Sequence, residues 1–129
     1  GEILLKPTHI YVSEILSLKK IVNINAISHI TGGGFYENIP RMLGENQMAI
    51  MNHDFQDWPF GHYFEWLMEV TDMPKKNLLN TFNCGVGLII SVDKSDEENA
   101  LGALNQRFFA RTIGKVQERE VNELQIKFV

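Results

Sequence analysis

Residues 26–34 read Ala-Ile-Ser-His-Ile-Thr-Gly-Gly-Gly, and the rest of the fold is predicted outward from this stretch. The alternation of side chains over residues 26–31 predicts a β-strand. The glycine triplet ends that strand, because residues without a Cβ favour turns over extended structure. Residues 35–43 then predict a short helix in which Pro40 suits a first-turn position or a break. A strand, a glycine loop and a helix are therefore expected in direct succession.

The residues before this stretch predict an extended segment followed by a helix. Pro7 disfavours the α region for Lys6, so residues 4–12 are expected to begin in extended form. From Ser13 onward the apolar residues fall mostly at helical spacing. Ser13 suits an N-cap, because its hydroxyl can accept a hydrogen bond from the first helical N–H groups.

The middle of the chain predicts one short strand and two helices. Residues 47–51 predict the strand, and Trp58-Pro59 is expected to open the first helix. The apolar side chains of this helix recur at i, i+3, i+4, i+7 and i+8 and are Phe60, Tyr63, Phe64, Leu67 and Met68. Pro74 suits the first position of the second helix, which is expected to bury Leu78 and Leu79.

Two more elements follow before the C-terminal strands. Residues 86–92 are almost continuously apolar, which predicts a central strand covered on both faces. Residues 95–98, Ser-Asp-Glu-Glu, read as a capping box. The helix behind it is expected to bury Leu101 and Leu104, with Phe108 as a further candidate.

The C-terminus predicts an antiparallel hairpin. Residues 111–117 and 121–128 flank a charged turn, and the second segment alternates apolar and polar side chains. Four or five strands and about four helices, not in strict βαβ alternation, predict an α+β fold. The expected sheet is mixed and largely antiparallel, with the helices packed against it.

Composition narrows the classes of protein. A chain of 129 residues fits a single domain over residues 1–129. Twelve Lys and Arg against 16 Asp and Glu give a net charge of −4, which argues against nucleic-acid and anionic-membrane partners. No apolar run approaches the roughly eighteen residues of a membrane span. Cys84 is the only cysteine, so no internal disulfide can form, which suits a cytoplasmic location.

The glycine loop is the strongest candidate for a binding site. Gly32, Gly33 and Gly34 let a ligand come close to the backbone without interference from a Cβ. Consecutive N–H groups near the start of a helix form a cradle for an anion such as phosphate. The sequence is neither a Walker A motif nor a GxGxxG fingerprint. A tight, flexible turn explains the same glycines, and the triplet by itself does not decide between the two.

Four further residues are weaker candidates. Arg41 lies seven residues past Gly34 and can pair with a phosphate, although a solvated surface arginine is the simpler interpretation. Asn38 on its own is an ordinary helix or turn residue. Asn83 carries an amide that can orient a substrate, and Gly85 permits close backbone approach. A helix C-terminal turn explains both of these last residues equally simply.

Structural roles explain the other reactive side chains more simply than catalysis or metal binding does. Activation of Cys84 by His29 would give a thiolate nucleophile, but nothing in the sequence places the two together, and a buried thiol is favoured. The histidines show no metal-binding spacing and are His9, His29, His53 and His62. No metal site is therefore predicted. The aromatic side chains expected in the core rather than on a stacking platform are Trp58, Phe60, Phe64 and Trp66.

Three segments, taken in order, resemble one enzyme family. They are residues 4–12, Leu-Leu-Lys-Pro-Thr-His-Ile-Tyr-Val; residues 27–41, Ile-Ser-His-Ile-Thr-Gly-Gly-Gly-Phe-Tyr-Glu-Asn-Ile-Pro-Arg; and residues 81–87, Thr-Phe-Asn-Cys-Gly-Val-Gly. Together they resemble the carboxy-terminal domain of phosphoribosylformylglycinamidine cyclo-ligase, also called aminoimidazole ribonucleotide synthetase. The resemblance runs from about residue 4 to the C-terminus. It departs at His9, where the family usually has Arg or Lys, and a mostly neutral imidazole would hold a phosphate less firmly.

The resemblance implies an ATP-dependent ring closure in purine biosynthesis, from formylglycinamidine ribonucleotide to aminoimidazole ribonucleotide. It implies ATP and magnesium as ligands of the full-length enzyme, none of them bound by this domain alone. The amino-terminal ATP-binding half is expected to lie outside this chain, and the full-length enzyme is expected to be a homodimer. The implied substrate- or phosphate-binding residues are His29, Thr31, Gly32, Gly33, Gly34, Asn38, Arg41, Asn83 and Gly85.

The resemblance leaves the catalytic acid and base unassigned. A non-catalytic module with the same fold, which binds phosphate or a partner without turnover, is the main alternative. Another ATP-using relative, such as the formylglycinamidine ribonucleotide amidotransferase or selenophosphate synthetase, is a third, although a different context from His29 to Arg41 would be expected there.

Overall fold

The structure is a computed structural model that describes residues 5, 7–52, 58 and 60–129. Its elements in chain order are α1 (Val12–Leu18), β1 (Ile24–His29), α2 (Gly34–Asn38), the 3₁₀ helix η1 (Pro40–Met42), β2 (Gln47–Met51), α3 (Gly61–Thr71), α4 (Lys75–Thr81), β3 (Leu88–Val92), the 3₁₀ helix η2 (Lys94–Asp96), α5 (Glu97–Leu104), β4 (Gly114–Glu118) and β5 (Ile126–Phe128). The predicted α+β class is confirmed.

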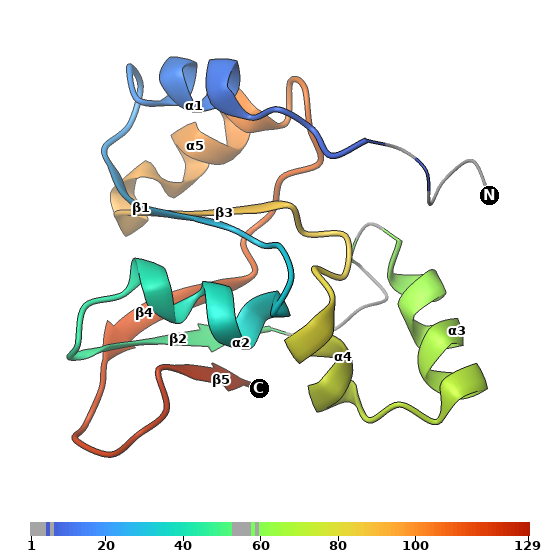
Figure 1. The fold of residues 1–129 in the computed structure, drawn as a ribbon. Coiled ribbons are helices and arrows are strands. Elements are labelled where there is room, and N and C mark those ends of the chain that lie inside the picture. Colours follow the sequence, from blue (N-terminus) through green and yellow to red (C-terminus); the bar gives the residue numbers. More distant parts are fainter. Residues whose placement is uncertain (1–4, 6, 53–57, 59) are drawn as a thin grey trace.

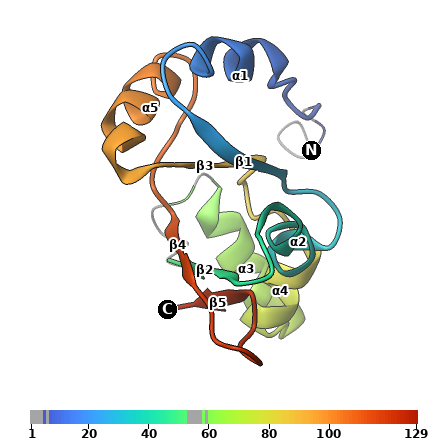
Figure 2. The same ribbon diagram turned by 90° about the vertical axis from the view of Figure 1, so that its left-hand side faces the viewer.

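The strands of the described residues form two sheets rather than one. In the first sheet β1 pairs with β3 antiparallel, with Ile27 opposite Ile90. In the second sheet β2 lies in the centre, antiparallel to β4 and parallel to β5. Figure 1 shows the β1–β3 pair between the helices α1 and α5 on one side and α2 with the second sheet on the other. Figure 2 shows the same layering from the side.

The predicted C-terminal hairpin is wrong. Strands β4 and β5 do not pair with each other, because β2 lies between them and bonds to both. Within β5 the alternation holds, since Ile126 is buried and Lys127 is exposed. It fails one step earlier, because Leu124 is 73% exposed and lies in the turn before β5. Alternation along two neighbouring segments does not reveal that a third strand separates them.

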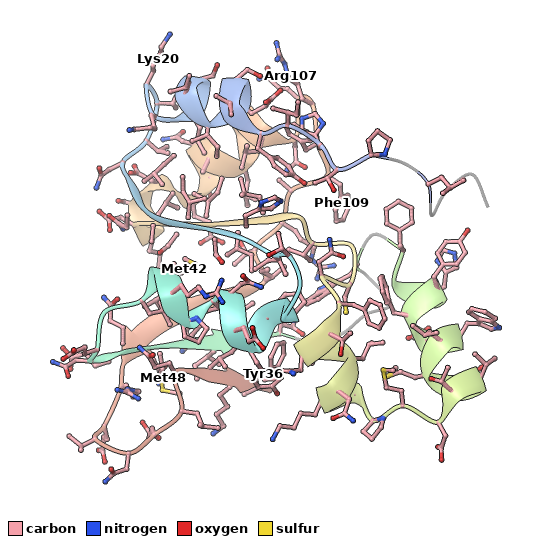
Figure 3. All side chains as sticks on the ribbon, viewed as in Figure 1. Lys20, Tyr36, Met42, Met48, Arg107 and Phe109 are labelled. Atoms are coloured by element: carbon pink, nitrogen blue, oxygen red, sulfur yellow. The ribbon has the colours of Figure 1, made fainter. Side chains whose placement is uncertain are left out.

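The main core lies around the segment that the sequence analysis started from. Its buried side chains come from the end of β1, from α2, α4, β2 and β5, and include Ile30, Phe35, Ile39, Leu78, Leu79, Cys84 and Ile126. The predicted burial of Leu78 and Leu79 is confirmed. The rings of Phe35 and Trp58 lie 5.5 Å apart, and the Tyr36 ring lies 5.4 Å from that of Phe128. Figure 3 labels Tyr36 beside α2. The helix after the glycine loop is therefore held by packing on several elements.

A second, smaller core joins α1 to α5. Its buried residues are Leu18, Val22 and Ala100. Strand β3 lies between the two cores, because Ile90 and Val92 pack on the smaller one and Ile89 packs on the main one. This position explains the continuous apolar run, but the prediction of a central strand is wrong, since β1 is the neighbour of β3 among the described strands.

Helix and strand ends differ from the predictions by a few residues. Tyr11, not Ser13, is the N-cap of α1, and Asp96, not Ser95, is the N-cap of α5; neither makes a side-chain capping bond. The capping-box prediction at Ser95 is therefore wrong. Pro74 is the N-cap of α4 rather than its first residue. Strands β1 and β3 are confirmed with shifted ends, and α3 begins at Gly61, two residues after Pro59, which lies outside the described residues.

The predicted break at Pro40 is confirmed, because α2 ends at Asn38 and η1 begins at Pro40. In α5 the buried residue is Ala100, whereas Leu101 and Leu104 are half-buried. The core prediction fails for two aromatic residues, since Phe60 is 45% and Trp66 is 58% exposed. None of the helices in the described ranges is long and apolar enough to cross a bilayer.

Candidate phosphate-binding site

The glycine loop connects β1 to α2 through two left-handed residues. Gly33 has φ +89° and Gly34 has φ +55°, a region that side chains with a Cβ rarely adopt. The N–H of Gly34 donates to the carbonyl of Thr31 at 3.0 Å, which closes the turn. Thr31 and Gly32 are exposed, and a Cβ at Gly32 would meet open space. The outer half of the loop is therefore accessible to a ligand.

Gly34, at the inner end of the loop, has a packing role. Gly34 is buried, and a Cβ placed there would collide with the carbonyl oxygen of Leu79 in α4. The absence of a side chain at Gly34 thus allows close approach of a helix, not of a ligand. The three glycines predicted together as a ligand cradle therefore differ: Gly32 is exposed, Gly33 is half-buried and Gly34 is buried.

The backbone amides of Gly32 and Gly33 have no hydrogen-bond partner among the described residues. The carbonyls of this loop, in contrast, are bonded. Unbonded N–H groups on an exposed loop are the groups that an anion binds through backbone contacts.

Asn38 lies beneath the loop rather than on its outer surface. It is only 4% exposed, and its side-chain amide Nδ2 donates to the carbonyls of Gly34 at 2.7 Å, Gly32 at 3.3 Å and Thr31 at 3.4 Å. The prediction that placed Asn38 among the ligand contacts is not supported by this geometry, since these bonds engage the Nδ2 group inside the protein. Its own carbonyl accepts a hydrogen bond from Ser28 Oγ at 2.9 Å.

Arg41 lies beside the loop and is open to solvent. Its Nη1 donates to Asn38 Oδ1 at 3.3 Å, and its side chain is 69% exposed. Its Nη2 is 3.9 Å from Glu37 Oε2, a surface ion pair of small energy. The Glu37 carboxylate also lies against Gly33, where it occupies the space that a Cβ would take. A positive and a negative side chain therefore flank the loop.

The segment with Asn83 and Gly85 forms a tight turn of its own. The N–H of Val86 donates to the carbonyl of Asn83 at 2.9 Å, and Cys84 and Gly85 between them both have positive φ, as in a type I′ turn. Asn83 Oδ1 accepts from the N–H of Gly85 at 3.1 Å. Two contacts bring this region near the loop, one from Gly34 to Leu79 and one from the N–H of Ile30 to the Gly87 carbonyl at 2.9 Å.

No hydrogen bond among the described residues joins this turn to the glycine loop itself. The two segments are thus neighbours in the structure, while the ligand-binding role that the resemblance implies for Asn83 and Gly85 stays a prediction.

Comparison with known proteins gives the family. The domain described as "AIR synthase related protein, C-terminal domain" matches residues 1–127. The chain belongs to this family. The resemblance carried by the three sequence segments is thereby confirmed. A curated relative from Alkaliphilus oremlandii (strain OhILAs), named phosphoribosylformylglycinamidine cyclo-ligase, is 47% identical over 119 residues. That match covers 92% of this chain but 34% of the relative, so the chain spans about a third of the relative's length.

In this AIR synthase-related domain, His29 and Cys84 lie in different surroundings. His29 is exposed at the end of β1, and its ring contacts the Tyr11 ring at 6.1 Å between centroids. Cys84 is fully buried, and its Sγ lies 3.8 Å from the Phe82 carbonyl. Burial raises the pKa of the Cys84 thiol to about 12. A thiol that stays protonated and shielded is a core residue, as the sequence analysis favoured.

His9 belongs to a cluster of rings and charges that sequence reasoning missed. Its ring packs edge-on against Tyr11 at 5.0 Å and Phe108 at 4.6 Å. Its Nε2 lies 3.9 Å from Glu14 Oε1, and the same oxygen lies 3.7 Å from Nη1 of Arg107, which Figure 3 labels beside α1. A hydrogen bond from Ser13 is the main cause that lowers the pKa of Glu14.

The contacts of His9 give it a packing role in this family member. No local sequence pattern predicts this cluster, because residues 9–14 contact residues 107 and 108, which are far away in the sequence.

A cavity of about 930 Å³ lies between the two sheets and away from the glycine loop. Residues from β3, α5 and β4 line it, and Gly85 lies at its edge. Among the described residues, no three His, Cys, Asp or Glu side chains are placed to hold a metal ion. His53 lies outside the described residues. The glycine loop is therefore the candidate anion site in the described part of this AIR synthase-related domain.

Proposed function

We propose that this chain is the carboxy-terminal part of a phosphoribosylformylglycinamidine cyclo-ligase and that its glycine loop binds the phosphate of the ribonucleotide substrate. Membership of the AIR synthase-related family and the 47% identical relative support a role in purine biosynthesis. The observation that carries the phosphate site is the pair of N–H groups at the exposed Gly32 and the half-buried Gly33, which have no hydrogen-bond partner among the described residues.

The chemistry of the loop suits a phosphate monoester. Backbone N–H groups on a left-handed turn point their positive ends at an anion, and glycine leaves space for the phosphate oxygens. Arg41 adds an exposed positive charge beside the loop, and a guanidinium can bond two phosphate oxygens at once. Such a site needs no net positive charge on the protein, so the overall charge of −4 does not oppose it.

In this proposal the chain contributes substrate positioning to an ATP-dependent ring closure. Binding energy from a remote phosphate can hold the reacting end of a substrate in place, which raises the rate of ring closure. ATP and magnesium are assigned to the rest of the full-length enzyme, since this chain spans about a third of the relative's length. Formylglycinamidine ribonucleotide is the proposed substrate.

Calorimetric titration with formylglycinamidine ribonucleotide and with inorganic phosphate tests the site. Gly32→Val adds a side chain in open space, so the fold is retained while the exposed N–H groups are covered. We expect at least about tenfold weaker binding of both ligands. Gly102→Val is the matched control, because a Cβ at Gly102 in α5 also meets open space. Equal affinities of the Gly32→Val and wild-type proteins for these ligands would show that the loop is not part of the substrate site.

A non-catalytic phosphate-binding module is the second candidate. It is favoured by one observation: the match covers 34% of the relative, so this chain corresponds to about a third of the ligase. One assay distinguishes the two functions. The chain is mixed with the amino-terminal part of the relative, and ATP-dependent formation of aminoimidazole ribonucleotide is measured. Product formation supports the ligase, whereas binding without product in a folded mixture supports the module.

A further inference from the structure

We propose that Asn38 is a positioning residue whose one side-chain amide sets both the glycine loop and Arg41 for anion binding. This inference rests on the proposed function, because it concerns the same loop. It assigns to Asn38 a role distinct from the direct ligand contact that the sequence analysis expected.

The first step concerns the direction of the loop carbonyls. Asn38 Nδ2 carries two hydrogens that are shared among the carbonyls of Thr31, Gly32 and Gly34, at distances of 2.7–3.4 Å. All three oxygens therefore point inward, toward the buried amide. A side chain that binds three carbonyls of one short loop determines the orientation of that backbone.

The second step follows from the planar trans peptide. In each peptide group the C=O of one residue and the N–H of the next point in opposite directions. When the carbonyls of Thr31 and Gly32 point inward to Asn38, the N–H groups of Gly32 and Gly33 point outward. These are the two amides without a hydrogen-bond partner among the described residues. Asn38 thus presents the donors of the anion site without touching the anion.

The third step concerns the other end of the same amide. Asn38 Oδ1 accepts from Arg41 Nη1 at 3.3 Å, so the guanidinium is tethered to the residue that orients the loop. Backbone donors and side-chain charge are therefore held in one arrangement by a single planar group. The residue itself is anchored from below, because Ser28 donates to its carbonyl in the buried interior.

Three single substitutions separate these links. Asn38→Asp keeps the size of the side chain and an oxygen for Arg41, but replaces the donor to the carbonyls by an acceptor. Arg41→Gln keeps the loop bonds and removes the charge. Ser28→Ala removes one buried hydrogen bond below Asn38 and leaves its amide in place, so it serves as the control for loss of stability.

The first readout is the pair of backbone amide resonances of Gly32 and Gly33, recorded by nuclear magnetic resonance before and after addition of inorganic phosphate. We expect Asn38→Asp to shift both resonances in the free protein and to abolish their response to phosphate. Arg41→Gln is expected to leave the free resonances near their wild-type positions. Ser28→Ala is expected to keep the response although the protein unfolds at lower denaturant concentration.

The second readout is affinity for formylglycinamidine ribonucleotide. We expect about tenfold or greater loss for Asn38→Asp, less loss for Arg41→Gln and no more than about twofold for Ser28→Ala. Folded Asn38→Asp protein with wild-type resonances and affinity would overturn the positioning role. If the wild-type protein binds neither ligand, the proposed function fails instead, and perturbed free-state resonances in Asn38→Asp would still show that Asn38 orients the loop.

Discussion

The backbone of Gly34 lies directly against the carbonyl oxygen of Leu79, with no space between them for a Cβ. This contact joins the start of α2 to α4 inside the main core, and it holds the glycine loop in place from behind. The position of the candidate phosphate site is therefore set by helix packing and does not depend on a bound ligand. Figure 1 shows α2 and α4 side by side, consistent with that contact.

Gly34→Ala is expected to destabilise the protein by at least about 2 kcal/mol. The left-handed backbone costs an alanine about 1–2 kcal/mol, and the overlap with the Leu79 carbonyl adds to it because backbone cannot move aside easily. Urea unfolding followed by circular dichroism measures the change.

Two other glycines provide controls for that experiment. Gly32→Ala is expected to change stability by less than about 0.5 kcal/mol, since a Cβ there meets open space. Gly87→Ala would displace only the Tyr11 hydroxyl, the far end of a side chain, so a loss between the other two is expected. Equal stability of all three variants would contradict the close contact at Leu79.

Ile126→Ala is expected to cost about 2–5 kcal/mol, whereas Leu124→Ala is expected to cost almost nothing. Ile126 is 4% exposed beside Ala49 of β2, and Leu124 is 73% exposed in the preceding turn. The two residues lie on the same side of the alternating pattern, so a hairpin with one buried face would make both costly. Chemical unfolding of both variants distinguishes the observed topology from that hairpin.

Cys84 is expected to resist alkylation by iodoacetamide at pH 8 in the folded protein and to react quickly in urea. Its pKa is about 12 in the folded state, above its ordinary value of 9.0. Because the folded pKa is raised, the thiol's contribution to stability is complete below about pH 9 and is lost as the pH rises toward 12. The stability of a Cys84→Ala protein should therefore fall less steeply than that of the wild type across this range. Rapid alkylation of the folded protein would contradict the burial.

Arg41→Gln is expected to weaken phosphate binding several-fold at low salt and much less at about 1 M salt, where screening acts within about 3 Å. The reason is that an exposed guanidinium contributes mainly long-range attraction. Arg107→Gln is the matched control, because Arg107 is 72% exposed and pairs with Glu14 beside α1. A salt dependence that is unchanged by Arg41→Gln would exclude this side chain from the site.

Local pattern was sufficient for most of the elements. Pro74 predicted the start of α4, Pro40 predicted the end of α2, and the apolar run before Val92 predicted β3. These predictions succeeded because each depends on spacing within a single turn or strand. The helix caps at Ser13 and Ser95 failed, since a capping residue must also have the right backbone angles, which sequence does not specify.

The sequence by itself determined the α+β class, the family and the glycine loop between strand and helix, because these follow from local spacing and an ordered set of motifs. The tertiary structure alone decided that β2 separates β4 from β5 and that Gly34 serves packing while Gly32 faces solvent. It alone showed that the Asn38 amide binds carbonyls from below. The physical reason is that burial and hydrogen-bond partners depend on contacts between segments far apart in the chain. Local residue spacing does not specify those contacts.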